Sequence, residues 1–144
     1  MIPQELFELM RKTGIFPAVL ATRDMQLQPH LTFLTWIYPL SETNIRLAVS
    51  SGSQSAKNML ENQFAGIILF SLDTAISIYG SVKLVLERIE ELKFPVSVFE
   101  LSIERIEDNL FPGGTVLGPI PFAHTGNLQK ASELDQIVIK AMMS

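Results

Sequence analysis

The segment ISIYGSVKLVLE, residues 76–87, constrains the fold of this chain more than any other part of the sequence. Apolar residues or glycine occupy every second position, which is the period of a β-strand with one buried face. A strand of this length must coil, and Gly80 near its centre is a natural position for a bend or bulge. The pattern therefore predicts a strongly curved antiparallel sheet.

Five other segments have the character of strands, and three have that of helices. Short apolar runs, β-branched residues and aromatic residues indicate strands at residues 16–22, 29–38, 45–50, 65–72 and 96–106. Short helices are expected at residues 4–13, 56–63 and 132–142, the last with Ser132 as its N-cap and Asp135 three residues on. We therefore expect a mainly β (α+β) fold, a six-stranded antiparallel barrel with short flanking helices, in a single domain over residues 1–144.

Composition narrows the class of protein further. Charged residues make up 18% of the chain, against about 25% in an average protein, so a ligand or a second chain should cover part of its apolar surface. Hydrophobic residues make up 47% and the net charge is −4, which excludes a disordered chain. The absence of cysteine excludes disulfides, thiolate metal sites and cysteine nucleophiles.

Neither a membrane nor a nucleic acid is an expected partner. The opening residues, MIPQELFELMRKTG, lack the basic start and apolar run of a signal peptide, so we expect a cytoplasmic protein. Residues 109–129 contain no Lys, Arg, Asp or Glu, but their prolines and glycines are typical of a loop and not of a membrane span. We expect the Gly/Pro-rich loop 111–126 near a bound ligand at a subunit interface. The isoelectric point of about 5.1 argues against general nucleic-acid binding.

One segment, IRLAVSSGSQSAKNMLEN, joins a strand, a small polar turn and the start of a helix. Backbone N–H groups in such a turn and the positive end of the helix dipole attract anions. A phosphate site would be completed by the hydroxyls of Ser51, Ser53 and Ser55 and by the ammonium group of Lys57. An ordinary serine-rich turn with an N-cap and an exposed lysine explains the same residues.

Few other residues are candidates for ligand binding or catalysis. Trp36 is the only tryptophan; with Thr35 it either borders a planar ligand or packs in the core or in a subunit interface. The two histidines, His30 and His124, are isolated, which favours local hydrogen bonds over a metal site. The sequence contains no nucleophile-elbow or zinc-protease motif, so it identifies no catalytic residue.

The order and spacing of these pieces resemble those of the pyridoxamine 5′-phosphate oxidase-like FMN-binding split barrels. The resemblance covers roughly residues 17–106 and lies in VLATRDMQLQPHLTFLTWIY, IRLAVSSGSQSAKNMLENQFAGIILFSL and ISIYGSVKLV. In that family a strand ending in Leu-Ala-Thr precedes a strand that begins near a proline, and a third strand runs into a turn with Ser and Lys. The resemblance implies a split β-barrel that binds FMN between the two subunits of a homodimer.

The resemblance also implies roles for individual residues. The FMN phosphate would be bound by Ser55 and Lys57, with a hydroxyl contribution from Ser51 and with Arg46 as a further candidate. The isoalloxazine ring would lie beside the strand that carries Thr32, Thr35 and Trp36.

Two departures separate the chain from the oxidase itself. The last segment, NLQKASELDQIVIKAMMS, has no arginine where the oxidase has one for its substrate's phosphate, and Thr32 stands where the oxidase has an FMN-phosphate arginine. We therefore expect an FMN-dependent oxidoreductase acting on a small molecule other than vitamin B6. The alternatives are a non-catalytic flavin- or haem-binding sensor or carrier, a deazaflavin-dependent reductase, and a dimeric barrel without a cofactor.

Overall fold

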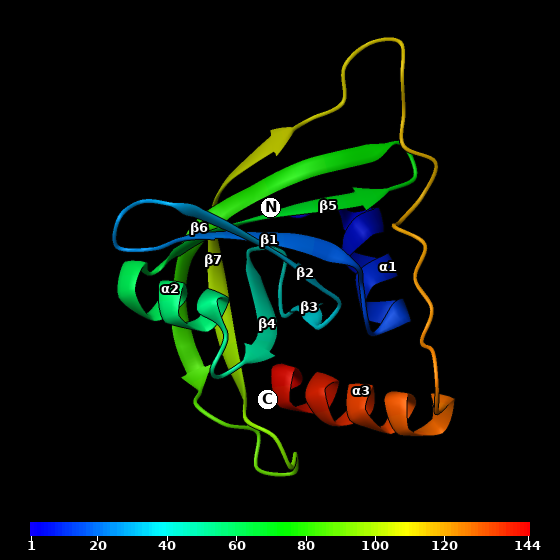
Figure 1. Cartoon of the computed structure of the whole chain (residues 1–144). Coiled ribbons are helices and arrows are strands. Elements are labelled where there is room, and N and C mark those ends of the chain that lie inside the picture. Colours follow the sequence, from blue (N-terminus) through cyan, green and yellow to red (C-terminus); the bar gives the residue numbers. More distant parts are fainter.

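A long hairpin of two strands, β6 (Thr74–Leu86) and β7 (Val96–Asp108), organises the sheet. In the computed structural model, which describes residues 1–144, each of these strands is 13 residues long and strongly bent (Figure 1). The register of their pairing shifts between Tyr79 and Gly80, so the irregularity predicted at Gly80 is confirmed. A Cβ atom at Gly80 would overlap the carbonyl oxygen of Ser102, so only glycine fits at this position.

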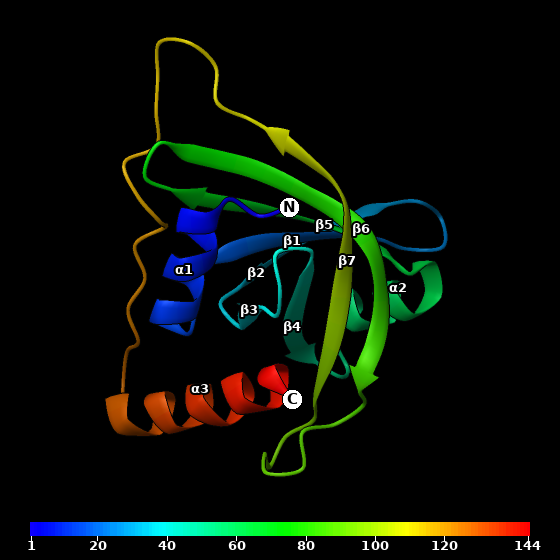
Figure 2. The ribbon, with the colours of Figure 1, turned by 180° about the vertical axis from the view of Figure 1, so that it is seen from behind.

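Seven antiparallel strands form one curled sheet in the order β2-β1-β5-β6-β7-β4-β3 (Figures 1 and 2). The remaining strands are β1 (Ala18–Arg23), β2 (Pro29–Leu34), β3 (Ile37–Pro39), β4 (Asn44–Ser50) and β5 (Phe64–Ser71). The mainly β, α+β fold predicted from the sequence is confirmed, with seven strands in place of six.

The extra strand arises because the predicted strand 29–38 divides into β2 and β3, which are the two opposite edges of the sheet. The backbone oxygen of Thr35 accepts a hydrogen bond from Phe16, next to β1, and that of Trp36 accepts one from Ala48 in β4. One continuous segment therefore leaves one edge of the sheet and joins the other. This crossing requires the sheet to curl until its edges approach each other. We call the crossing, residues 35–36, the seam.

Apolar side chains fill the inside of the curled sheet and the space beneath the last helix. The larger core has 21 buried residues, which come from the strands, from α2 (Gln54–Asn62) and from α1 (Gln4–Thr13) and its flanks. A second core of eight buried residues joins α3 (Leu128–Met143) to β3, β4 and β7 and includes Val138 and Met142. None of the helices has the length and apolar character needed to cross a membrane.

Two helices begin earlier than the sequence predicts. Ser53 caps α2 by accepting the N–H of Ala56, so α2 starts at Gln54 and not at residue 56. Asn127 caps α3 by accepting the N–H of Lys130, so the N-cap predicted at Ser132 is wrong. Asparagine caps a helix as well as serine does, and Asn127 stands more than one turn earlier in the chain.

Candidate functional site

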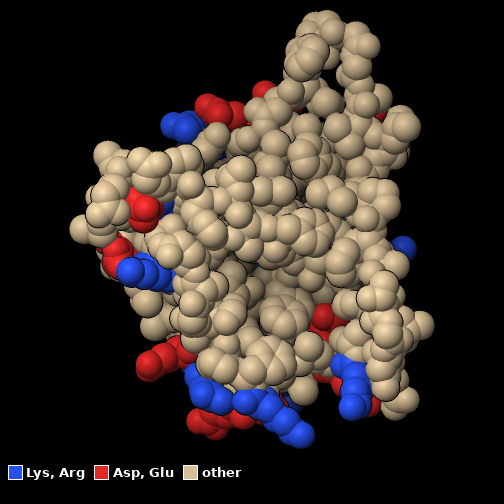
Figure 3. Space-filling model, in the orientation of Figure 1, with Lys and Arg blue, Asp and Glu red and all other residues tan.

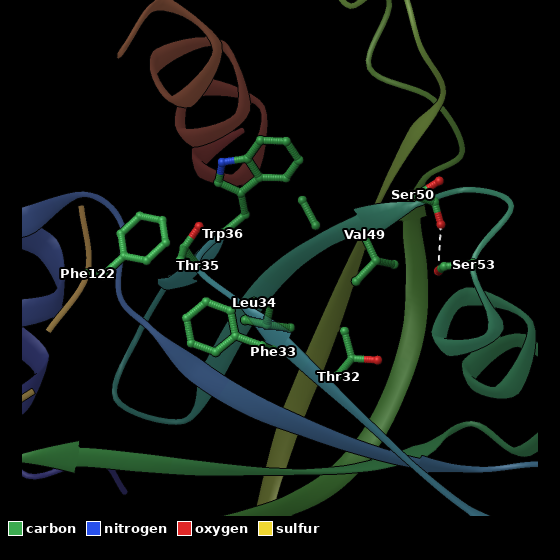
Figure 4. Close-up of a pocket in the computed structure, with 10 residues that line it drawn as sticks. Thr32, Phe33, Leu34, Thr35, Trp36, Val49, Ser50, Ser53 and Phe122 are labelled. Carbon is green, nitrogen blue, oxygen red and sulfur yellow. Dashed lines mark hydrogen bonds between the residues drawn. The ribbon is translucent and has the colours of Figure 1, made fainter. Parts of the chain in front are cut away.

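An open hollow of about 420 Å³ lies at the seam, and we call it the seam pocket. Its walls come from the end of β2, from the seam, from the end of β4, from the turn before α2 and from the long loop before α3 (Figure 4). The ten lining residues are Thr32, Phe33, Leu34, Thr35, Trp36, Ala48, Val49, Ser50, Ser53 and Phe122. The volume lies within the range of pockets that bind cofactors and other small molecules.

One end of the seam pocket is aromatic. The rings of Phe33, Trp36 and Phe122 border the hollow from β2, from the seam and from the loop 109–127 (Figure 4). The ring centroids of Phe33 and Phe122 lie 6.0 Å apart, within the range for interacting aromatic pairs. The uncharged loop thus supplies a wall of the pocket, and three rings form a surface suited to a planar ligand.

A buried carboxylate lies behind this aromatic end. Asp135 on α3 is 8% exposed, and its Oδ1 accepts a hydrogen bond from Nε1 of Trp36 at 2.8 Å. Its other oxygen, Oδ2, lies 2.6 Å from Nε2 of His124. The spacing of Asp135 from Ser132 suggested a helix cap, and this interpretation is wrong because the carboxylate faces the seam instead.

The opposite end of the seam pocket is polar and adjoins the start of α2 (Figure 4). The hydroxyl of Ser53 donates to the carbonyl oxygen of Ser50 at 2.7 Å and accepts the N–H of Ala56 at 3.1 Å. The backbone N–H groups of Gln54 and Ser55 have no acceptor within the chain. Unpaired N–H groups at a helix N-terminus favour the binding of an anion.

Thr32 and Ser55 meet at this polar end. Their Oγ atoms lie 2.8 Å apart, and Oγ1 of Thr32 also lies 3.0 Å from Nε2 of His30. Ser55 is 1% exposed, so its hydroxyl binds Thr32 inside the fold, and Ser55 itself does not line the seam pocket. The structure therefore brings Thr32, Ser53 and Ser55 together around the start of α2.

Two further residues predicted to bind phosphate lie near this turn in different surroundings. Lys57 is exposed on α2, and its ammonium group makes no hydrogen bond or ion pair. Oγ of Ser51 lies 2.7 Å from Oγ of Ser97 and faces the connection between β6 and β7. Ser51 does not line the seam pocket.

Arg46 is directed away from the seam pocket. Its Nε donates to Oε1 of Glu100 at 2.7 Å, and its Nη1 donates to the carbonyl oxygens of Met142 and Ser144. The guanidinium group therefore holds the end of α3 against β4 and β7. The sequence could not show which face of its strand Arg46 occupies, and the structure does not bring it to the other predicted phosphate ligands.

The outer face of the sheet beside the pocket is apolar and exposed. Leu31 and Phe33 of β2 are 70% and 51% exposed, and Leu31 shares a shallow depression with Val19, Ala21 and Ile68 of the neighbouring strands. Figure 3 shows that charged residues on the face carrying β1 and β2 gather mostly around its margin. The low proportion of charged residues in the sequence is thus reflected in this apolar surface. We call it the outer β2 face.

No protein-family model and no curated protein matches the sequence. Solved structures do match the fold. HupZ from Group A Streptococcus superposes with a TM-score of 0.63 at 19% identity, covering 82% of this chain and 100% of its own. A candidate pyridoxamine 5′-phosphate oxidase from Lactobacillus delbrueckii gives 0.61 at 15% identity, covering 74% and 93%. An FMN-binding protein from Syntrophomonas wolfei gives 0.54 at 16% identity, covering 75% and 88%.

The chain has the pyridoxamine 5′-phosphate oxidase-like fold. The resemblance found in the sequence is thereby confirmed at the level of the fold. In this split barrel the seam is the place where the two edge strands approach without pairing, and the seam pocket occupies it.

Sequence reasoning missed several residues of the pocket and of its surroundings. Phe33 alternates with Thr32 and is predicted only as part of a strand. Phe122, which lines the pocket, and Asp135, which lies behind it, stand about ninety and a hundred residues further along the chain. The sequence carries only a weak signal of the role of the uncharged loop. In this loop the apolar ring of Phe122 and the titratable ring of His124 stand two residues apart. Only the fold shows that this segment reaches the seam.

Proposed function

We propose that this chain binds FMN in the seam pocket and acts as a flavin-dependent oxidoreductase on a small molecule. The observation that carries the proposal is the polarity of the pocket, which is aromatic at one end and hydroxyl-lined at the other, next to two unpaired N–H groups. FMN has the same polarity, since a planar ring system and a phosphate stand at opposite ends of the molecule. The volume of about 420 Å³ is of the size that such a ligand needs.

Each end of the pocket has a distinct task. Phe33, Trp36 and Phe122 orient the ring and exclude water from its faces. The N–H groups of Gln54 and Ser55 donate to the phosphate, and Lys57 supplies a mobile positive charge. A bound flavin supplies the redox chemistry, and the protein supplies position and hydrogen bonds.

The lining residues favour a flavin over haem. Other proteins of this fold include HutZ, the haem storage protein from Vibrio cholerae, and an F420 reductase. Haem iron needs an axial ligand such as His, Cys, Met or Tyr. None of the ten residues that line the seam pocket is of these types, whereas an aromatic and hydroxyl-lined pocket suits a flavin or a deazaflavin.

A second copy of the chain completes the site in this proposal. Phe33 both lines the seam pocket and stands exposed on the outer β2 face, so a protein surface laid on that face also reaches the mouth of the pocket. The charge-poor face fits an apolar partner surface, and a homodimer satisfies this requirement with the chain's own composition.

Binding of FMN to the full chain is the experiment that tests the proposal. Trp36 is the only tryptophan and lines the pocket, so quenching of its fluorescence reports occupancy directly. We expect FMN to quench Trp36 and to bind more tightly than riboflavin, which lacks the phosphate. Mass spectrometry of the ligand released from the purified protein should identify FMN.

Other outcomes would point to the alternatives. A Soret band would indicate haem, and a deazaflavin spectrum would indicate an F420-type cofactor. Absence of both a co-purified ligand and Trp36 quenching would contradict the flavin site itself. Reduction of the bound flavin by NADH or NADPH and its reoxidation would distinguish an enzyme from a carrier.

A further inference from the structure

We propose that Asp135 is a positioning residue for the ring-binding end of the seam pocket. One carboxylate oxygen fixes the indole of Trp36, and the other fixes the segment that carries Phe122 through His124. The inference rests on the proposed flavin site. It assigns to α3 the role of setting the distance between two walls of the seam pocket, those formed by Trp36 and by Phe122. Neither Asp135 nor His124 lines the pocket, so both act from behind the rings.

The loop that carries Phe122 depends on this contact. Residues 118–126 make no backbone hydrogen bond, and their single side-chain hydrogen bond is the one between His124 and Asp135. The other contacts described for this segment are aromatic: Phe122 with Phe33, and the edge of the His124 ring against Phe122 at 5.4 Å between centroids. Loss of the hydrogen bond therefore leaves Phe122 held by ring contacts alone.

Trp36 depends on Asp135 in the same way. The seam has only two residues, and its backbone oxygens bind Phe16 and Ala48 on opposite sides. The indole N–H of Trp36 is its one side-chain donor, and Asp135 is the acceptor that fixes the rotation of the ring. A carboxylate only accepts hydrogen bonds when ionised, so His124 donates from Nε2 and the two donors converge on one buried group.

This arrangement predicts a selective effect on ligands. Changes at His124 or Asp135 displace the aromatic end and should weaken the binding of every ligand that carries the isoalloxazine ring. They should not alter the advantage of FMN over riboflavin, because the phosphate lies at the other end of the pocket, beside α2. A merely structural role for the network would lower the stability of the fold without such a pattern.

The test uses the full chain and three variants: His124→Ala, which removes the donor; His124→Gln, which restores a donor to Asp135; and Gln129→Ala, which removes a surface hydrogen bond on the same helix. Affinities for riboflavin and FMN are measured by flavin fluorescence, and folding by urea denaturation. We expect His124→Ala to weaken the binding of both ligands equally, by about tenfold in Kd. His124→Gln should recover most of the affinity, and Gln129→Ala should bind both ligands as tightly as the unmodified chain.

Quenching of Trp36 by acrylamide in the ligand-free protein gives an independent readout. We expect His124→Ala to increase the quenching, because the loop beside the indole is released, and His124→Gln to leave it unchanged. Unaltered quenching in His124→Ala, unaltered riboflavin affinity, or failure of His124→Gln to restore either would overturn the positioning role. If the unmodified chain binds neither flavin, the proposed function fails, while the acrylamide result still decides the role of Asp135.

Discussion

Oγ of Ser55 and Oγ1 of Thr32 lie 2.8 Å apart, although one belongs to the first turn of α2 and the other to β2. This contact fixes the start of a helix against an edge strand of the sheet. As a result, the unpaired N–H groups of Gln54 and Ser55 are held beside the seam pocket. The polar end of the candidate site is therefore a property of how α2 docks and not of its serine residues alone.

Substitution of Ser53 separates helix capping from ligand binding. Asp and Asn both replace Ser as N-caps at little cost, so Ser53→Asp and Ser53→Asn should unfold at similar urea concentrations. The carboxylate of Ser53→Asp repels a phosphate, so the affinity for FMN should fall by something on the order of tenfold. The affinity for riboflavin should change little. Equal FMN affinities in the two variants would argue against a phosphate at this turn.

Removal of the ammonium group of Lys57 should weaken the binding of FMN but not the binding of riboflavin. The side chain is exposed and has no partner, so Lys57→Ala loses a charge-assisted contact with the phosphate, worth about tenfold in Kd. The matched control is Lys93→Ala, another exposed lysine without an ion pair, far along the chain between β6 and β7. Titration of both variants at two salt concentrations checks the result, and identical losses would refute a specific role.

A charge on the outer β2 face should prevent self-association. Leu31→Asp places a carboxylate in the middle of the exposed apolar surface. If the unmodified chain forms the proposed dimer, we expect light scattering to report a monomer for this variant. Leu72→Asp is the control, since Leu72 is similarly exposed at the turn between β5 and β6. A dimer that survives Leu31→Asp would place the subunit contact elsewhere.

Alanine at Gly80 should destabilise the whole sheet. Its Cβ would collide with the carbonyl oxygen of Ser102, and the bulge between β6 and β7 would have to shift, at a cost of about 1–3 kcal/mol. Gly114→Ala provides the comparison, because nothing lies within 4 Å of a Cβ at that position. Urea denaturation measures both, and a stable Gly80→Ala protein would show that the bulge is dispensable.

The Arg46–Glu100 pair should support stability and leave the preference for FMN over riboflavin unaffected. Arg46→Met leaves Glu100 buried without its main cationic partner, which costs about 3–5 kcal/mol for a buried pair. The double variant Arg46→Met, Glu100→Met should recover much of the loss, because no charge then remains unpaired. The folded double variant should keep the preference of the unmodified chain for FMN over riboflavin. A loss of that preference would restore Arg46 as a phosphate ligand.

The sequence predicted the parts of the fold that follow from local pattern. The alternation around Gly80 indicated the long curved strand, and the serine-rich turn indicated the start of a helix near Lys57. The sequence could not show that strand 29–38 crosses from one edge of the sheet to the other, because its composition is strand-like throughout. Which strand accepts its hydrogen bonds depends on the curl of the whole sheet.

The candidate site divides in the same way. Ser53 and Ser55 belong to the turn before α2 or to its first helical residues, and Thr32 lies on the neighbouring strand β2. The sequence pattern and the family resemblance were therefore enough to select these three residues as candidates. The sequence predicts Trp36 and the uncharged loop near a ligand, but the contacts that join Trp36, His124 and Asp135 connect segments far apart in the chain. The way in which the aromatic end is assembled could therefore be found only from the three-dimensional structure.

The seam also forms part of the wall of the seam pocket, so its length bears on the width of that pocket. Because two residues alone connect the edge strands, the length of this link sets the gap between them, and neither edge depends on pairing with the other. We expect a residue inserted between Thr35 and Trp36 to widen this opening while the strand ladders on either side keep their register. Engineering of new ligands into this barrel should therefore begin with the length of that link, before any change to the side chains around it.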